Sequence, residues 1–232
     1  MKIVMAGLLV MVMTTFSWVT GATAETKRPF TGLYGAIGQH QSSGDFSLSH
    51  RGELFSFGEI LNVPLQGSIT TYEVGYRIPM GQTNMRFGVN AVLHDGTIAG
   101  AKRWEGFKSS ATFGVSSDLR LSLGAEVGTV VGEQERLYLF VRAGMVASDL
   151  NASLAIDTPW GDWGREKSGG AVGNTFSVGM EYQVNNRLSV GLSASQMEFD
   201  AAKAFGLGDM GEQRFEATLK QTTFGLDVSF RF

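Results

Sequence analysis

The sequence predicts an all-β fold, an eight-stranded antiparallel transmembrane β-barrel preceded by a cleavable signal peptide. Three observations support this fold: strands with one wholly apolar face, short turns that alternate with longer polar stretches, and an apolar N-terminal segment that ends at a small-residue cleavage motif. Residues 1–24 are expected to form the signal peptide and residues 25–232 a single barrel domain.

The clearest strand lies at the C-terminus, where residues 222–232 read TTFGLDVSFRF. Side chains alternate between the two faces of a strand, so one face here is entirely apolar and the other is polar or small. In a soluble sandwich the apolar face would point into the core. In an outer-membrane barrel it points to lipid and the polar face lines the lumen. The apolar face carries Phe224, Leu226, Val228, Phe230 and Phe232.

The same alternation recurs in five further segments, and six such segments in one chain do not arise by chance. Their expected lipid-facing residues are Tyr72, Val74, Tyr76 and Ile78; Met85, Phe87, Val89, Ala91 and Leu93; Leu119, Leu121, Leu123, Ala125 and Val127; Phe176, Val178, Met180 and Tyr182; and Leu188, Val190, Leu192 and Ala194.

The connections between these segments predict the strand count. Three tight turns are expected, at Pro79 to Asn84, Gly132 to Glu135 and Val184 to Arg187. Four longer polar stretches are expected to be outer loops, at 41–66, 95–117, 149–172 and 198–214. With both termini periplasmic, three turns and four loops give eight strands, an even number as bacterial single-chain barrels require.

Two segments leave the strand assignment open. Phe107 to Ser116 also alternates, and we interpret it as an upper extension of the strand that contains Leu119. The alternative is a ten-stranded barrel with another strand near 46–57. The first strand, near Phe30 to His40, has no clear orientation because its glycines do not keep one parity.

The N-terminus has the organisation of a signal peptide. Met1-Lys2 gives a positive start, Ile3 to Val19 is almost continuously apolar, and Ala22-Thr23-Ala24 forms a cleavage motif before Glu25. The alternative is an N-terminal membrane anchor. No later stretch approaches the roughly 18 apolar residues of a membrane helix, so a mature protein that stays in a membrane must cross it with strands.

The composition excludes several classes of site. The formal net charge of −3 provides no basic field for nucleic acid, and the absence of cysteine excludes disulfides and thiol chemistry. The three histidines, His40, His50 and His94, are scattered without the carboxylate spacing of a metal site. We therefore expect no metal, no cofactor and no nucleic-acid partner.

Residues 72–93, 119–146 and 175–194 resemble the opacity-type and OmpA-like small barrels, including alphaproteobacterial "porin family" proteins. In that family a GxxY–turn–xLSxGxxA hairpin precedes a last strand with an aromatic end, and here Gly179–Tyr182, Leu188–Gly191 and Phe230–Phe232 occupy those places. The resemblance implies a monomer in the outer membrane of a Gram-negative bacterium, in contact with its lipids and lipopolysaccharide. It also implies that the barrel-assembly machinery recognises the terminal Phe232.

The expected lumen is rich in charge. Charges inside a narrow protein interior must find partners, and an eight-stranded barrel is just wide enough for side chains to fill it. We therefore expect a lumen plugged by mutually neutralising charges, and the alternative is a narrow ion or small-solute channel. The acids are Glu73, Glu126, Glu181 and Asp227, and the bases are Arg77, Arg86, Arg120, Arg142 and Arg231.

One short motif has the form of a catalytic site. His40-Gln41-Ser42 has the H-x-S spacing of lipid A 3-O-deacylase barrels, in which histidine activates serine for attack on an acyl ester. A partner acid cannot be identified from the sequence, and the motif falls where the first loop begins. A lipid A-modifying enzyme is therefore the least favoured function, and no catalytic residue is assigned.

The outer loops hold the remaining candidates for function, because loops on a rigid scaffold are where binding concentrates. Trp104, Trp160 and Trp163 all fall there, and a membrane-interface girdle or packing within the loops is favoured over partner binding. The first loop is unusually apolar and suggests a strand extension or a lid, with Phe46, Leu54, Phe55, Phe57, Ile60 and Leu61. We expect a structural or surface-interaction barrel, with an extracellular ligand at the loops as one option.

Overall fold

The computed structural model describes residues 28–52, 59–106, 109–205 and 213–232, so the expected signal peptide lies outside the described residues. The described residues form strands and one short helix. In chain order these are β1 (Gly32–Gly52), β2 (Glu59–Pro79), β3 (Met85–Asp95), β4 (Thr97–Gly106), β5 (Ser109–Val131), β6 (Leu137–Thr158), β7 (Gly161–Gln183), β8 (Leu188–Asp200), α2 (Ala201–Ala204) and β9 (Gln213–Arg231).

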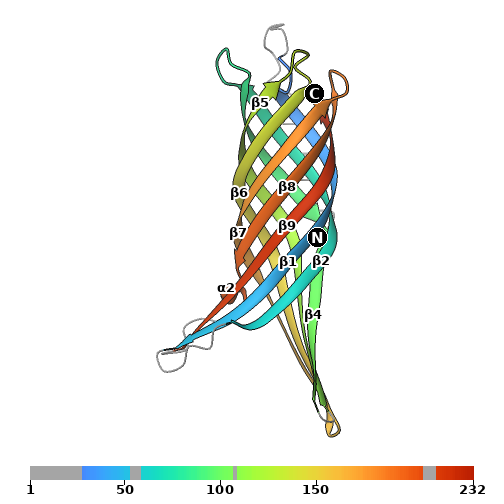
Figure 1. Cartoon of the computed structure of the whole chain (residues 1–232), viewed down its shortest axis with the longest axis vertical. Coiled ribbons are helices and arrows are strands. Elements are labelled where there is room, and N and C mark those ends of the chain that lie inside the picture. The colour runs from blue at the N-terminus through green and yellow to red at the C-terminus, as the bar shows by residue number, and fades with distance from the viewer. Residues whose placement is uncertain (1–27, 53–58, 107–108, 206–212) are drawn as a thin grey trace.

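These strands close into one antiparallel ring (Figure 1). β1 pairs with both β2 and β9, which removes the sheet edges that lipid could not satisfy. β3 and β4 share one place in the ring, between β2 and β5, and are separated at Gly96 with φ of 152°. The predicted eight-stranded barrel is therefore confirmed.

The ten-stranded alternative is wrong, because residues 46–52 continue β1. The three predicted turns are confirmed between β2 and β3, β5 and β6, and β7 and β8. The segment from Ser109 to Ser116 is the upper part of β5, as interpreted, while residues 107–108 lie outside the described residues.

The four predicted loops are wrong over much of their length, since the strands continue through them. β1 runs to Gly52, β6 to Thr158, and β7 begins at Gly161, so paired hairpins replace coil. Outside the membrane both faces of a strand can be polar, and the apolar alternation that marks a lipid-facing strand is then absent. Polar composition alone was therefore a poor sign of a loop.

A belt of exposed apolar side chains surrounds the half of the barrel that holds the short turns. The predicted outward faces of β2, β3, β7, β8 and β9 are confirmed. None of the helices among the described residues has the length and apolar character to cross a membrane. The belt includes Ile37, Tyr72, Tyr76, Ile78, Phe87, Val89, Leu123, Val141, Met145, Val172, Phe176, Met180, Val190, Leu192, Phe224, Leu226, Val228 and Phe230.

A β-bulge in β5 turns two residues to the face opposite to the predicted one. The pairing of β5 with β6 shifts register between Leu119 and Leu121, which inserts one extra residue and reverses the inward and outward parity. Leu119 is consequently buried inside, and Arg120 points outward, where its Nε donates to Asp149 Oδ2 at 2.9 Å. Leu119 was expected to face lipid and Arg120 to face the lumen, and both expectations are wrong.

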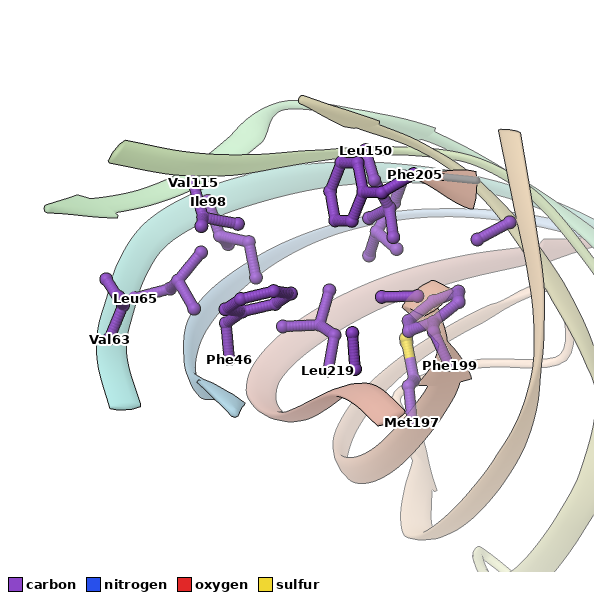
Figure 2. Close-up of a cluster of buried hydrophobic side chains, with 14 of the residues drawn as sticks. Phe46, Val63, Leu65, Ile98, Val115, Leu150, Met197, Phe199, Phe205 and Leu219 are labelled. Atoms are coloured by element: carbon purple, nitrogen blue, oxygen red, sulfur yellow. The ribbon is translucent and has the colours of Figure 1, made fainter. Parts of the chain in front are cut away.

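An apolar core fills the outer half of the barrel, where the bulge turns apolar residues inward (Figure 2). Phe46 of β1 lies at its centre, with its ring 6.0 Å from Phe113 of β5 and 6.0 Å from Phe205, which follows α2. Phe46 and Leu61, expected in an unusually apolar first loop, belong to this core, whereas 54–57 lie outside the described residues. Other members are Val63, Leu65, Ile69, Ile98, Val115, Leu150, Met197, Phe199, Ala217 and Leu219.

Beyond this core the ring divides into two diverging sheets (Figure 1). β2 and β4 pair at only two positions, Gln66 with Ala99 and Gly67 with Ile98. On the other side, pairing of β7 with β8 begins at Gly173 with Phe199. We call the outer sheet formed by residues 97–106, 109–118, 149–158 and 161–172 the β4–β7 blade. The other outer sheet consists of the ends of β9, β1 and β2.

Candidate functional site

The lumen of the barrel holds a network of side-chain hydrogen bonds, ion pairs and ring contacts. At the end near the short turns, the segment before β1 turns into the lumen at Phe30, which has a positive φ of 58° and is completely buried. A positive φ is unusual for a bulky residue and indicates a conformation held by its surroundings. The Phe30 ring stacks on Tyr138 at 5.2 Å between centroids, and the Arg231 guanidinium lies 4.8 Å from its centroid.

Arg77 is the centre of the next layer. Its Nε donates to Glu126 Oε1 and its Nη1 donates to Glu181 Oε2, both at 2.7 Å. The guanidinium also lies over two rings, 4.1 Å from the centroid of Tyr34 and 4.7 Å from that of Tyr138. Because the Arg77 side chain is only 3% exposed, these contacts replace nearly all of its hydration.

Arg142 extends this cluster across the lumen. Its Nη2 lies 2.8 Å from both Glu73 Oε1 and Glu126 Oε2, so Glu126 is shared between two guanidiniums. The Tyr34 hydroxyl donates to Glu73 at 2.6 Å and the Tyr138 hydroxyl donates to Glu126 at 3.0 Å. The cluster therefore joins β1, β2, β5 and β6 by charge-assisted hydrogen bonds, which are the stronger kind.

The remaining predicted lumen bases have other partners. Arg86 and Arg231 point inward as expected. Arg86 Nε donates to the Pro29 carbonyl at 3.1 Å, and Arg231 Nη2 donates to Ser189 Oγ at 3.3 Å. The prediction of mutual pairing thus holds for Glu73, Glu126, Glu181, Arg77 and Arg142. Arg120 is the exception described above, on the outer surface.

Asp227 belongs to a separate polar group deeper in the barrel. Its Oδ1 lies 2.9 Å from His40 Nε2, and its Oδ2 accepts from the Ser193 hydroxyl at 2.9 Å. Sequence reasoning missed this pair, because His40 on β1 and Asp227 on β9 meet only where the first and last strands close the ring. This contact also settles the orientation of β1, whose even-numbered residues face the lumen.

His40 and Ser42 of the H-x-S motif share the lumen face but bind different partners. His40 contacts Asp227, whereas Ser42 Oγ accepts from Gln221 Nε2 at 2.8 Å. Both side chains are buried inside the barrel. A nucleophile needs an adjacent base and access to its substrate. The arrangement places neither residue near the lipid face.

A small cavity of about 70 Å³ lies between the charge cluster and the apolar core. His40, Thr71, Glu73, Asn90 and Asp227 are among the residues that line it. A cavity of this volume and polar lining has room for ordered water. His94, also on its wall, has its Nε2 3.1 Å from Ser122 Oγ. The described residues contain no cluster of three possible metal ligands.

Glycines make room for the large lumen side chains. Tyr34 lies opposite Gly75 in the register, and a Cβ added at Gly75 would come within 2.5 Å of the Tyr34 ring. Phe140 likewise lies against Gly179, its partner on β7. A glycine paired with an aromatic residue on the neighbouring strand therefore indicates that the aromatic fills the lumen. Such pairs can be recognised in the sequence only once the strand register is known.

Trp104 and Trp163 lie far out on the β4–β7 blade, and Trp160 lies at its β6–β7 turn. Trp160 at the β6–β7 turn is 94% exposed, and Trp104 and Trp163 are about half exposed. At about 3.3 Å per residue, Trp163 stands about 30 Å along β7 from the belt residue Val172. Of the two favoured expectations, a membrane-interface girdle does not fit residues that lie beyond the belt on extended hairpins. Packing within the outer segments agrees with the cations beside Trp104 and Trp163.

Comparison with known families agrees with this geometry. A family model described as "Outer membrane protein beta-barrel domain" matches residues 8–232. The chain belongs to this outer-membrane β-barrel family. The resemblance to small outer-membrane barrels is therefore confirmed, and family membership places the protein in the bacterial outer membrane. A search of curated proteins finds no significant match.

Several solved barrels are similar to this chain. Neisserial surface protein A is 14% identical with a TM-score of 0.38, over 84% of this chain and 97% of that chain. The Ail attachment invasion locus protein of Yersinia pestis is 13% identical with a TM-score of 0.33, over 88% and 100%. The outer membrane protease OmpT from Escherichia coli is 7% identical with a TM-score of 0.49, over 91% and 100%.

Proposed function

We propose that the protein is a non-conducting scaffold that displays two outer sheets for interactions at the cell surface. The observation that carries this proposal is the sequence of filled layers along the lumen. A solute moving along the axis would meet the Phe30–Tyr138 stack, then the charge cluster around Arg77, and then the apolar core around Phe46. Each layer spans strands from opposite sides of the ring.

The energetics of the charge cluster support a closed lumen. An ion that passed Arg77 would have to separate it from Glu126 or Glu181, and breaking a buried pair costs about 3–5 kcal/mol. The apolar core adds a second barrier, because an ion crossing it would lose its hydration with no polar group to replace water. A narrow channel, the alternative, would require both layers to open together.

The outer sheets support the interaction role. A closed barrel that served only as a membrane plug would gain nothing from hairpins that continue about 30 Å past the lipid belt, at about 3.3 Å per residue. We propose no catalytic role for His40 or Ser42, since each is buried and bound to another partner. The partners proposed from the family resemblance are lipopolysaccharide around the belt and the assembly machinery at Phe232.

Single-channel recording of the purified protein in planar bilayers tests this function. We expect no discrete conductance steps from the folded, heat-modifiable barrel at neutral pH. The matched sample is the same preparation after heat denaturation, which controls for bilayer defects. Reproducible steps of one size that appear only with the folded barrel would overturn the proposal and favour the channel.

A further inference from the structure

The β4–β7 blade has two chemically different faces. Directly paired residues of antiparallel strands point to the same side of a sheet, so the register assigns every residue of the blade to a face. One row runs across all four strands: Trp104, Ala111, Ile156 and Trp163. The next row toward the membrane is Lys102, Phe113, Leu154 and Arg165.

These rows belong to the inner face, which looks across the barrel mouth. Two rows closer to the barrel, the same face carries Ile98 and Leu150 of the apolar core, which fixes its direction. Phe113 still packs against the core, whereas Leu154 and Ile156 farther out are partly exposed. Among the described residues of the blade, the charged side chains on this face are Lys102, Arg165 and Lys167, and none is acidic.

The outer face has the opposite charge. Arg103 is the one base on this face of the described blade, and its Nε lies 3.4 Å from Glu105 Oε1; Arg120, just below the blade, has its Nε 2.9 Å from Asp149 Oδ2. The described acids of this face are Glu105, Asp118, Asp149, Asp157, Asp162 and Glu166. The blade therefore separates its charges, with cations toward the mouth and anions toward the surroundings of the barrel.

On the inner face each tryptophan has a cation beside its ring. Lys102 Nζ lies 5.8 Å from the centroid of Trp104, and Arg165 Cζ lies 5.4 Å from that of Trp163. The two tryptophans are separated by three strand spacings, about 14 Å. The face thus offers two ring-and-cation pairs on a flat sheet with partly exposed apolar residues between them.

We propose that this inner face binds an acidic polysaccharide from outside the cell. Sugar rings would lie against Trp104 and Trp163, and carboxylates on the chain would pair with Lys102 and Arg165. Arginine binds a carboxylate through two parallel hydrogen bonds, so the pair has a defined geometry as well as strength. The proposal rests on the display function above and names the ligand class for it.

The Lys102–Trp104 pair fits a polysaccharide better than a protein partner, because lysine is depleted at the centre of protein interfaces, whereas tryptophan and arginine are enriched there. Lipopolysaccharide anchored around the barrel would meet the acidic outer face, which would repel its phosphates. Aromatic rings with cations also suit single-stranded nucleic acid, so that class is included as an outcome of the test.

Titration calorimetry of the folded barrel in detergent with polygalacturonate oligosaccharides tests the proposal. We expect saturable binding that weakens as salt rises, because the pairs are exposed. Lys102→Glu and Arg165→Glu should each weaken binding about tenfold through the loss of one charge-assisted contact. Trp104→Ala and Trp163→Ala should also each weaken it about tenfold, through the loss of one ring against a sugar. Two matched controls, Arg103→Glu on the opposite face and Trp160→Ala at the turn, should leave affinity within about twofold, since neither residue lies on the inner face. Heat-modifiable mobility verifies that every variant is folded.

Several outcomes would overturn the proposal. They are no binding of polygalacturonate to the folded wild-type barrel, equal binding of neutral dextran of the same length, and equal loss in Arg103→Glu and Lys102→Glu. Tighter binding of oligo-dT or of rough lipopolysaccharide than of polygalacturonate would also overturn it. Conductance is measured separately, so failure of this ligand assignment is distinguishable from failure of the non-conducting scaffold on which it rests.

Discussion

Replacing Arg77 by methionine tests whether the lumen cluster stabilises the barrel. The substitution removes ion pairs of 2.7 Å to Glu126 and to Glu181 while roughly keeping side-chain volume. Glu126 retains Arg142 at 2.8 Å, so the carboxylate left without a cation is mainly Glu181. Breaking one buried pair costs about 3–5 kcal/mol. We expect the free energy of unfolding to fall by about 4 kcal/mol.

Urea unfolding of the barrel in lipid vesicles, followed by tryptophan fluorescence, measures this change. Arg120→Met is the matched control, because Arg120 also pairs at 2.9 Å but is 53% exposed on the outer surface. Exposed pairs contribute about 0–1 kcal/mol, so the control should be nearly neutral. Adding Glu181→Gln to Arg77→Met should recover about 1–2 kcal/mol by removing the uncompensated charge.

Two results would contradict this account of the cluster. One is a loss for Arg77→Met that equals the loss for Arg120→Met. The other is a further decrease in the free energy of unfolding when Glu181→Gln is added. A neutral amide at this position does not need the missing cation, so the addition should not destabilise the barrel. Either result would mean that the buried charges do not depend on one another.

Three further predictions concern other parts of the chain. Gly75→Ala should lower the free energy of unfolding by about 1–3 kcal/mol in the same urea assay, because its Cβ would overlap the Tyr34 ring. The like charge of Asp157, and the hydrogen bond that the protonated Asp162 donates to it, raise the pKa of Asp162 at the outer hairpin. Since a raised carboxyl pKa makes the paired hairpin less stable as pH rises, Asp162→Asn should slow amide exchange there at neutral pH, and unchanged exchange would exclude this effect. Deletion of Phe232 should reduce the heat-modifiable barrel in membrane fractions, and unchanged abundance would argue against its recognition during assembly.

The sequence was most informative where lipid constrains it. The strand ending at Phe232 and its partner hairpin at Val184–Arg187 could be predicted with their faces and their turn, because a lipid-facing strand must be apolar at every second position. The paired lumen charges could also be predicted, because a narrow interior does not tolerate an isolated charge.

What could not be predicted depends on contacts distant in sequence or on local irregularity. The bulge at Arg120 has no distinctive composition, yet it reverses every orientation beyond it. The pair of His40 with Asp227 forms only through the closure of β1 on β9. Above the belt, Lys102 interrupts the apolar residues on one face of β4 and Arg103 those on the other, so β4 lacks the apolar alternation of a lipid-facing strand.

The division of the ring into two sheets also defines how deeply the barrel can sit in the bilayer. Hydrocarbon cannot hydrogen-bond to a free strand edge, whereas water can, so the opening between β2 and β4 must lie in water. The outermost closing pairs, Gln66 with Ala99 and Gly173 with Phe199, therefore mark the upper limit for the hydrocarbon boundary. The exposed Val172 lies one residue from that limit, so backbone pairing and side-chain hydropathy independently indicate the same immersion depth.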